Sequence, residues 1–129
     1  MLTRGPRTGF RVRPNPSRPV VVRVDDPDGA ELFYATDVSE SGVGFLVLSP
    51  GLPLAVGATV QLTLTLPSPV ASVFRCRGEV RRLDGARCGI ALVDLRDSQI
   101  GLLRNYVATR LACHDFKERT AERVAVVTC

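Results

Sequence analysis

The feature that most constrains the fold of this chain is a strictly alternating segment, residues 59–66, with the sequence TVQLTLTL. Valine and leucine occupy every second position, and threonine or glutamine occupies the others. Because side chains point alternately to the two faces of a strand, this pattern predicts a β-strand with one face buried and the other in solvent. Proline and glycine stand on both sides of the segment and bound it.

Similar short apolar segments recur along the chain between turn-forming residues. They predict strands at residues 20–24, 31–38, 43–48, 59–66, 73–82 and 87–93. After them, Ile100, Leu103, Val107 and Leu111 recur at helical spacing, and Asp97 or Ser98 is the expected N-cap. Six short antiparallel strands followed by one helix indicate an all-β fold, a small barrel with the C-terminal helix closing one end.

The length of 129 residues predicts one domain, and a 45% hydrophobic content is sufficient for a packed core. We expect a flexible basic N-terminal arm at residues 1–18, in which prolines prevent a helix. The barrel and its helix are expected at residues 19–112, and a C-terminal extension at residues 113–129.

Positive charge is concentrated at the N-terminus. Residues 1–24 contain six arginines and no acid, whereas the remaining chain carries 11 basic and 13 acidic residues. This asymmetry favours an arm that binds an anion. A nucleic-acid polymer is not expected, because only 5% of the residues are aromatic. The sequence has neither a signal peptide nor an apolar run of membrane-spanning length, which predicts a cytoplasmic protein with no membrane contact.

The four cysteines form no C-x-x-C pair and the chain has a single histidine, so no metal site is expected. A two-residue turn at Asp84-Gly85 would pair Leu83 with Ala86 and would place Cys88 opposite Arg81. Cys76 would then be too far from Cys88 for a disulfide. We therefore expect free thiols and a reducing compartment.

Catalysis is not expected either. Any nucleophilic arrangement would have to use His114, and no glycine-rich phosphate loop is present. One constellation remains at the end of the second predicted strand, formed by Asp37, Ser39, Gly42 and Gly44. Asp37 and Ser39 are expected on one face, Gly42 would permit a positive φ, and Gly44 would leave room close to the backbone. These residues fit either a stabilised turn or a ligand-binding site.

The pattern D-x-S-x-x-G-x-G at residues 37–44 resembles the signature of PilZ domains, bacterial receptors for cyclic di-GMP (c-di-GMP). Residues 78–82, residues 88–92 and the helical segment at residues 102–107 resemble the last strands and the C-terminal helix of that family. The similarity extends over roughly residues 7–110 in the right order. It implies a six-stranded PilZ-like barrel that uses no cofactor and takes c-di-GMP as its ligand.

The resemblance implies that Asp37, Ser39, Gly42 and Gly44 contribute to the ligand site. The family's second motif, R-x-x-x-R before the first strand, matches Arg7 and Arg11, although Arg13 or Arg18 could instead occupy the second position. An arginine fork matches the O6 and N7 acceptors of guanine, and a basic arm suits the two phosphates. Asp37 would accept from the guanine N1–H and N2–H groups.

The expected function is that of a c-di-GMP receptor that transmits the signal by ordering its arginine arm and contacting a bacterial protein partner. The resemblance places such signalling in motility and biofilm control. An alternative is a degenerate PilZ domain, a nucleotide-independent adaptor in motility, pilus or envelope regulation.

Overall fold

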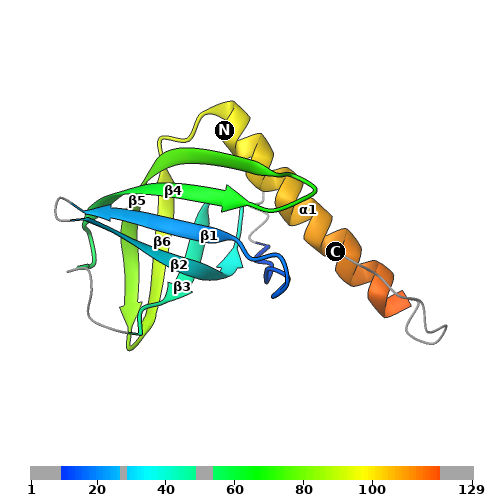
Figure 1. Ribbon diagram of the computed structural model, residues 1–129, viewed down its shortest axis with the longest axis horizontal. Helices are drawn as coiled ribbons and strands as arrows, with labels where there is room; N and C mark the ends of the chain where they lie inside the picture. The colour runs from blue at the N-terminus through cyan, green and yellow to red at the C-terminus, as the bar shows by residue number, and fades with distance from the viewer. Residues whose placement is uncertain (1–9, 27–28, 49–53, 120–129) are drawn as a thin grey trace, which may run out of the picture.

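The strands and the helix follow one another along the chain in the order that the sequence predicts (Figure 1). The computed structural model describes residues 10–26, 29–48 and 54–119. The elements are β1 (Val21–Asp26), β2 (Gly29–Val38), β3 (Gly42–Leu46), β4 (Thr59–Leu66), β5 (Ser72–Asp84), β6 (Arg87–Val93) and α1 (Asp97–Arg119).

The six strands form a closed antiparallel barrel in the order β1-β2-β3-β6-β5-β4. The alternation in β4 has the predicted effect, because Leu62, Leu64 and Leu66 are at most 1% exposed while the residues between them are not buried. Facing side chains of all six strands fill the interior. The prediction of a six-stranded antiparallel barrel with one C-terminal helix is confirmed.

Helix α1 begins against the barrel and extends past it toward the C-terminus (Figure 1). Leu103, Tyr106 and Val107 are buried, whereas Ile100 and Leu111 of the predicted apolar stripe are only partly covered. The Tyr106 hydroxyl is buried and has no hydrogen-bond partner among the described residues. Burial raises the pKa of Tyr106, and the positive charge of Arg110 opposes that shift.

The start of α1 differs from the prediction by one or two residues. The N-cap is Arg96, whose carbonyl accepts hydrogen bonds from the N–H groups of Gln99 and Ile100. The Gln99 side chain reaches back, and its Oε1 accepts from the Arg96 N–H at 2.9 Å. Its Nε2 donates to the Arg75 carbonyl at 2.9 Å, which ties the helix to β5. Asp97 is the first helical residue, where its negative charge suits the helix dipole.

The predicted register of the β5–β6 hairpin is wrong by one residue. Asp84 pairs with Arg87, and the two-residue loop is Gly85-Ala86, because Gly85 (φ 64°) takes the first loop position, where a positive φ is needed. Cys88 therefore lies opposite Leu83. A bulge between Val80 and Arg82 shifts the register again, and Val80 pairs with Ile90.

The cysteines follow the prediction in part. Cys76 and Cys88 are free, and burial raises the pKa of the Cys76 thiol to about 11 and that of Cys88 in the same direction. Cys113 is disulfide-bonded, so the expectation of four free thiols is wrong for this residue, which lies partly exposed on α1 and away from the barrel strands. Cys129 lies outside the described residues. The disulfide at Cys113 therefore contradicts the argument for a reducing compartment, which was drawn from free thiols throughout the chain.

Part of the N-terminal arm packs on the barrel. Val12 is 6% exposed and belongs to the core, and its N–H and carbonyl exchange hydrogen bonds of 2.9 Å with those of Val38. Val12 therefore belongs to the core although it lies within the segment that was expected to be a flexible arm. At the other end of the chain, α1 continues to Arg119, so the first residues of the predicted extension are helical.

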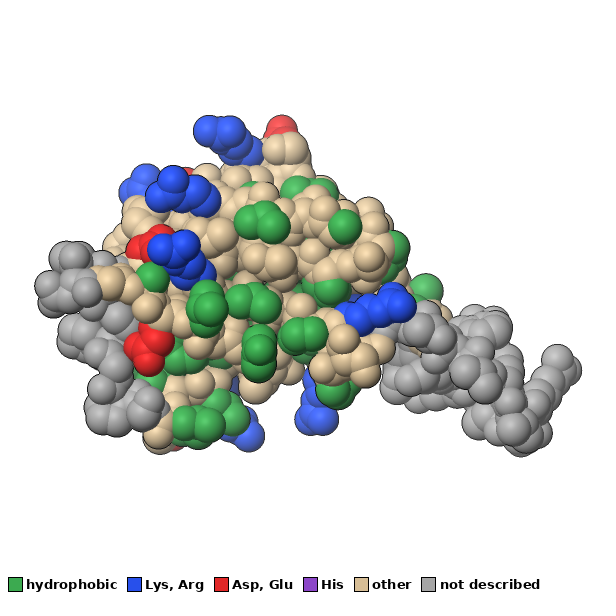
Figure 2. Space-filling model, in the orientation of Figure 1, with side chains coloured by type: hydrophobic (Ala, Val, Ile, Leu, Met, Phe, Trp, Pro, Cys, Tyr) green, Lys and Arg blue, Asp and Glu red, His purple; other side chains and the backbone are tan. Residues whose placement is uncertain are grey.

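Hydrophobic side chains also gather on the outer surface in the view of Figure 2. Exposed examples in the strands are Leu32, Tyr34 and Val73. Among the described residues, no helix is both long enough and apolar enough to cross a membrane.

Candidate functional site

A groove of about 1050 Å³ lies on the outside of the barrel. The arm, the end of β2, strand β3 and the β5–β6 hairpin all contribute to its lining. The charged residues in that lining are five arginines and one carboxylate, namely Arg11, Arg13, Arg81, Arg82, Arg87 and Asp37. A concave surface with this excess of positive charge attracts an anionic ligand.

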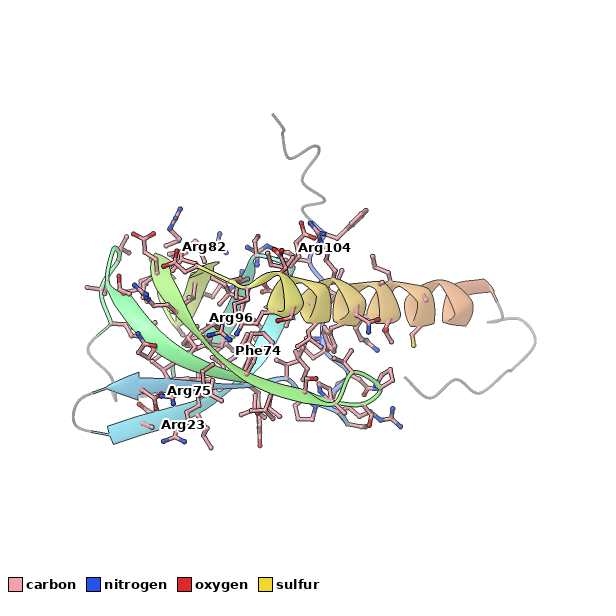
Figure 3. The ribbon with its side chains drawn as sticks, turned by 90° about the horizontal axis from the view of Figure 1, so that it is seen from above. Arg23, Phe74, Arg75, Arg82, Arg96 and Arg104 are labelled. Carbon is pink, nitrogen blue, oxygen red and sulfur yellow. The ribbon has the colours of Figure 1, made fainter. Side chains whose placement is uncertain are left out.

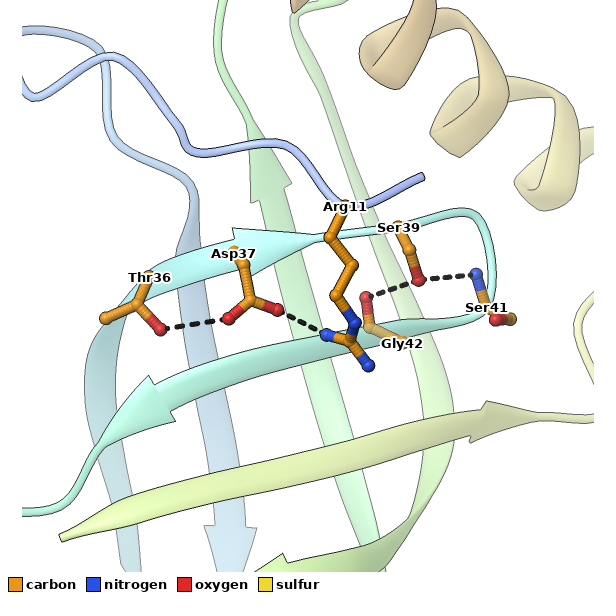
Figure 4. Close-up of polar contacts among 6 residues, drawn as sticks. All are labelled: Arg11, Thr36, Asp37, Ser39, Ser41 and Gly42. Atoms are coloured by element: carbon orange, nitrogen blue, oxygen red, sulfur yellow. Dashed lines mark hydrogen bonds and ion pairs between the residues drawn. The ribbon is translucent and has the colours of Figure 1, made fainter. Parts of the chain in front are cut away.

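Asp37 and Arg11 meet in this groove (Figure 4). The Arg11 guanidinium donates from Nη1 to Oδ1 of Asp37, and the Thr36 hydroxyl donates to Oδ2 at 3.3 Å. The Arg11 side chain is 59% exposed and that of Asp37 is 33% exposed. An ion pair this accessible to water contributes at most about 1 kcal/mol. Another partner can therefore replace either member at low cost.

Gly44 explains how the Asp37 carboxylate reaches this position. Asp37 lies directly opposite Gly44 in the β2–β3 pairing, after a bulge between Ala35 and Asp37. A Cβ atom on Gly44 would lie 2.8 Å from Oδ2 of Asp37 and 3.1 Å from Oδ1, closer than real contacts allow. The sequence predicts that some group lies close to the Gly44 backbone, and in this structure that group is the Asp37 carboxylate.

Gly42 also lines the groove, but a glycine is needed there for a different reason from the one predicted. Its φ is not positive, so the expectation of a left-handed turn residue is wrong. Gly42 begins β3, and a Cβ atom there would lie 2.9 Å from the carbonyl oxygen of Ile90 on β6. The glycine is required by close packing of two strands rather than by turn geometry.

Ser39 is not among the residues that line the groove. It is 6% exposed, and its Oγ accepts from the Ser41 N–H at 3.2 Å and lies 3.4 Å from the Gly42 carbonyl, to which it donates (Figure 4). In this structure the Ser39 hydroxyl stabilises the turn between β2 and β3. Of the two predicted residues that would share a face, only Asp37 points into the groove.

The predicted arm arginines are in different positions. Arg11 and Arg13 line the groove, Arg18 does not, and Arg7 lies outside the described residues. The Arg13 carbonyl accepts a hydrogen bond of 2.9 Å from Nε of Arg110 on α1. The literal R-x-x-x-R match therefore has its second arginine, Arg11, in the groove beside Asp37.

The β5–β6 hairpin contributes groove residues that were not predicted from the sequence, among them Arg81, Arg82, Arg87 and Gly89. Two consecutive arginines that interrupt the apolar alternation of β5 were the available signal. Glu40, which forms an ion pair of 2.8 Å with Arg104 of α1, was not predicted either. Helix α1 thus contacts the turn that follows Asp37.

No group of three or more potential metal-ligating side chains occurs among the described residues. The family comparison is decisive, because the PilZ domain family model matches residues 6–109. The chain belongs to the PilZ family. The match includes the arm, the barrel and the first half of α1 of this PilZ domain. No curated protein matches the sequence significantly.

Solved PilZ structures share the fold at low identity. The PilZ domain of YcgR from Escherichia coli, solved with c-di-GMP, aligns over 87% of this chain and 95% of its own at 16% identity, with a TM-score of 0.66. MrkH from K. pneumonia in its apo state aligns over 90% of this chain and 56% of its own at 16% identity, with a TM-score of 0.71. The inhibitor of motility MotI from Bacillus subtilis covers 79% of this chain and 50% of its own at 16% identity, with a TM-score of 0.65. This PilZ domain therefore spans about half the length of MotI and MrkH.

Proposed function

We propose that this PilZ domain is a receptor for c-di-GMP and that it binds the nucleotide in the groove between the arm and the β5–β6 hairpin. The observation that carries the proposal is the meeting of Arg11 and Asp37, one residue from each family motif, in a groove lined by five arginines. Structures of YcgR and MrkH with c-di-GMP, which share this fold, support the choice of ligand.

Asp37 supplies base specificity in this proposal. Its carboxylate is a pure acceptor that lies close to the Gly44 backbone and lines the groove, within reach of a ligand there. Guanine offers the N1–H and N2–H donors side by side, and a carboxylate can accept from both. Adenine offers no such pair, so Asp37 would discriminate against adenine dinucleotides.

Arg11 changes partner on binding. In this structure it neutralises Asp37, and on binding the guanine donors take its place on the carboxylate. The freed guanidinium then meets a phosphate of the nucleotide, which forms the stronger class of charge-assisted hydrogen bond. Because the exposed Arg11–Asp37 pair is worth at most about 1 kcal/mol, this exchange is favourable. Arg7 and Arg13 are the two candidates for the second phosphate contact.

Ligand binding would be communicated to the rest of the molecule by a change in the positions of the arm and α1. The arm is held to α1 by the hydrogen bond from Arg110 to the Arg13 carbonyl, and the turn after Asp37 is held by the Glu40–Arg104 pair. A ligand that repositions Arg11 and Arg13 therefore alters the surface where arm and helix meet. We propose that a bacterial protein partner recognises this surface.

The test is calorimetric titration of the purified chain with c-di-GMP, with cyclic di-AMP as a ligand of the same charge. We expect binding of c-di-GMP and at least 100-fold weaker binding of cyclic di-AMP. Asp37→Ala and Arg11→Ala should each reduce c-di-GMP affinity at least tenfold, since each removes a charged hydrogen-bonding partner. Arg75→Ala, which removes an exposed arginine outside the groove lining, is the matched control and should bind as the wild type.

Failure of the wild-type chain to bind c-di-GMP would contradict the proposal and would favour a nucleotide-independent adaptor. Equal affinity for the two dinucleotides would show that Asp37 does not read the base.

A further inference from the structure

Four groove residues form one continuous row across four neighbouring strands. Asp37 of β2 pairs with Gly44 of β3, Gly44 pairs with Gly89 of β6, and Gly89 pairs with Arg82 of β5. All four line the groove. At the usual spacing between strands, the backbones of Asp37 and Arg82 lie roughly 14 Å apart. A carboxylate and a guanidinium thus stand at the two ends of one row.

The bulge in β5 places Arg82 on this outer face. Val80 is buried and pairs with Ile90, so strict alternation would turn Arg82 inward as well. The register shift between Val80 and Arg82 adds one residue to β5 and turns Arg82 outward. Its Cβ lies 3.5 Å from the position of a Cβ atom on Gly89. The local irregularity of β5 therefore brings a guanidinium to the groove.

The space between the two ends of the row is open. A Cβ atom on Gly89 would meet only the Arg82 Cβ within 4 Å, whereas Gly44 is already covered by the Asp37 carboxylate. A planar group above Gly89 can therefore approach the backbone closely and reach Asp37 on one side and Arg82 on the other.

Arg82 is also better suited to a ligand than its neighbour Arg81. Its neighbour Arg81 pairs with Glu79 at 2.9 Å, but no ion pair joins Arg82 to another residue in the described part of the chain. Arg82 is exposed and belongs to β5, well separated from Arg75 of the same strand (Figure 3). Its five N–H donors are therefore available for a planar acceptor pair.

We propose that Arg82 is a second base-recognition residue. It donates to O6 and N7 of the guanine whose N1–H and N2–H groups face Asp37, and the base lies over Gly89. This inference rests on the proposed function and assigns the guanine acceptor edge to the barrel. The arm arginines are then left for the phosphates, so each part of the groove has a separate task.

The test compares two ligands and two charge-matched variants by calorimetry. The ligands are c-di-GMP and its 7-deazaguanine analogue, which lacks the N7 acceptor. Arg82→Ala should weaken c-di-GMP binding about 10- to 100-fold, the usual range for loss of a bidentate arginine–guanine contact. Arg75→Ala removes the same charge from the same strand and should leave the affinity within twofold. For the 7-deaza analogue, Arg82→Ala should cost less than threefold.

Gly89→Val tests the position of the base independently of charge. Its Cβ atom would have only the Arg82 Cβ within 4 Å, and β-branched residues suit strands, so the barrel should fold normally by circular dichroism. A side chain above Gly89 occupies the place of the base, and c-di-GMP affinity should fall more than tenfold.

Wild-type affinity of Arg82→Ala for c-di-GMP would overturn this inference and leave the proposed function intact. An equal loss for both ligands would overturn the guanine contact and indicate a contact of Arg82 with phosphate. Absence of c-di-GMP binding by the wild-type chain would overturn the proposed function and this inference together.

Discussion

Gly44 shows how one missing side chain determines the geometry of the groove. The Asp37 carboxylate occupies the place that a Cβ atom on Gly44 would take, and from there it meets Arg11. In the sequence, this requirement is visible only as a glycine within a predicted strand. Which group lies against it depends on the pairing of Asp37 with Gly44, which the sequence does not specify.

Gly44→Ala should therefore act on binding rather than on folding. The methyl group would displace the flexible Asp37 side chain, and c-di-GMP affinity should fall at least tenfold because a charged hydrogen-bonding partner leaves its position. Gly101→Ala on α1 is the control, since nothing lies within 4 Å of its Cβ position. That variant should bind normally and gain about 0.5–1 kcal/mol of stability. Unchanged binding by Gly44→Ala in calorimetry would show that the carboxylate position does not matter.

Substitution of Ser39 distinguishes the two roles of its motif, which are stabilisation of the β2–β3 turn and binding of the ligand. Its hydroxyl is buried and serves the turn, so Ser39→Ala leaves the Ser41 N–H without this acceptor. We expect a loss of about 1–2 kcal/mol in the free energy of unfolding in urea and a change in c-di-GMP affinity of less than about threefold. Ser41→Ala, at an exposed side chain, should leave stability nearly unchanged. A stable Ser39→Ala variant that no longer binds would instead indicate a direct contact between this hydroxyl and the nucleotide.

At the scale of elements, the positions and buried faces of the strands were predictable but the hairpin register was not. The alternation in β4 specifies its buried face, and the predicted strands match those of the barrel closely. In the β5–β6 hairpin, Asp84-Gly85 looked like the loop, yet that register would have set Val80 opposite Gly89. In the structure, buried Val80 pairs with buried Ile90. The loop at Gly85-Ala86 and the bulge between Val80 and Arg82 accommodate this pairing. Packing of apolar faces thus outweighed local turn preference, and Arg82 reached the groove as a result.

The start of α1 depends on Gln99, which sequence reasoning did not select. Its amide accepts from the Arg96 N–H and donates to the Arg75 carbonyl, so it joins a helix terminus to a strand. Gln99→Ala removes both hydrogen bonds and should lower the free energy of unfolding by about 1–2 kcal/mol. Gln99→Glu keeps the acceptor and loses the donor, so it should be intermediate. Ser98→Ala is the control at an exposed neighbouring position, and an equal effect of Ser98→Ala and Gln99→Ala would contradict this role.

At the scale of the whole molecule, the barrel and α1 both hold the arm that lines the groove. Val12 is paired with Val38, and Arg110 holds the Arg13 carbonyl. These contacts join residues that are distant in the sequence, so composition alone predicted only a flexible basic arm. Its proline content and charge predicted a flexible basic arm, and the described part of that arm contains a turn closed by the hydrogen bond from the Arg18 N–H to the Asn15 carbonyl. A single valine that fits the core was not distinguishable from its neighbours without the barrel.

Limited trypsin digestion tests whether the nucleotide fixes the arm. The bond after Arg11 precedes Val12, which must leave the core before cleavage, so the rate should report the population of released arm. Bonds after Arg13 and Arg18 precede proline and resist trypsin. At 100 times its Kd, c-di-GMP stabilises the closed arm by about 2.7 kcal/mol relative to the released arm. Cleavage after Arg11 should therefore slow roughly 100-fold. Arg110→Ala removes the hydrogen bond to the arm and should speed cleavage of the free protein about fivefold, whereas Arg75→Ala should not. If c-di-GMP binds while cleavage after Arg11 keeps its rate, the arm does not take part, and the ligand is held by the barrel face around Asp37 alone.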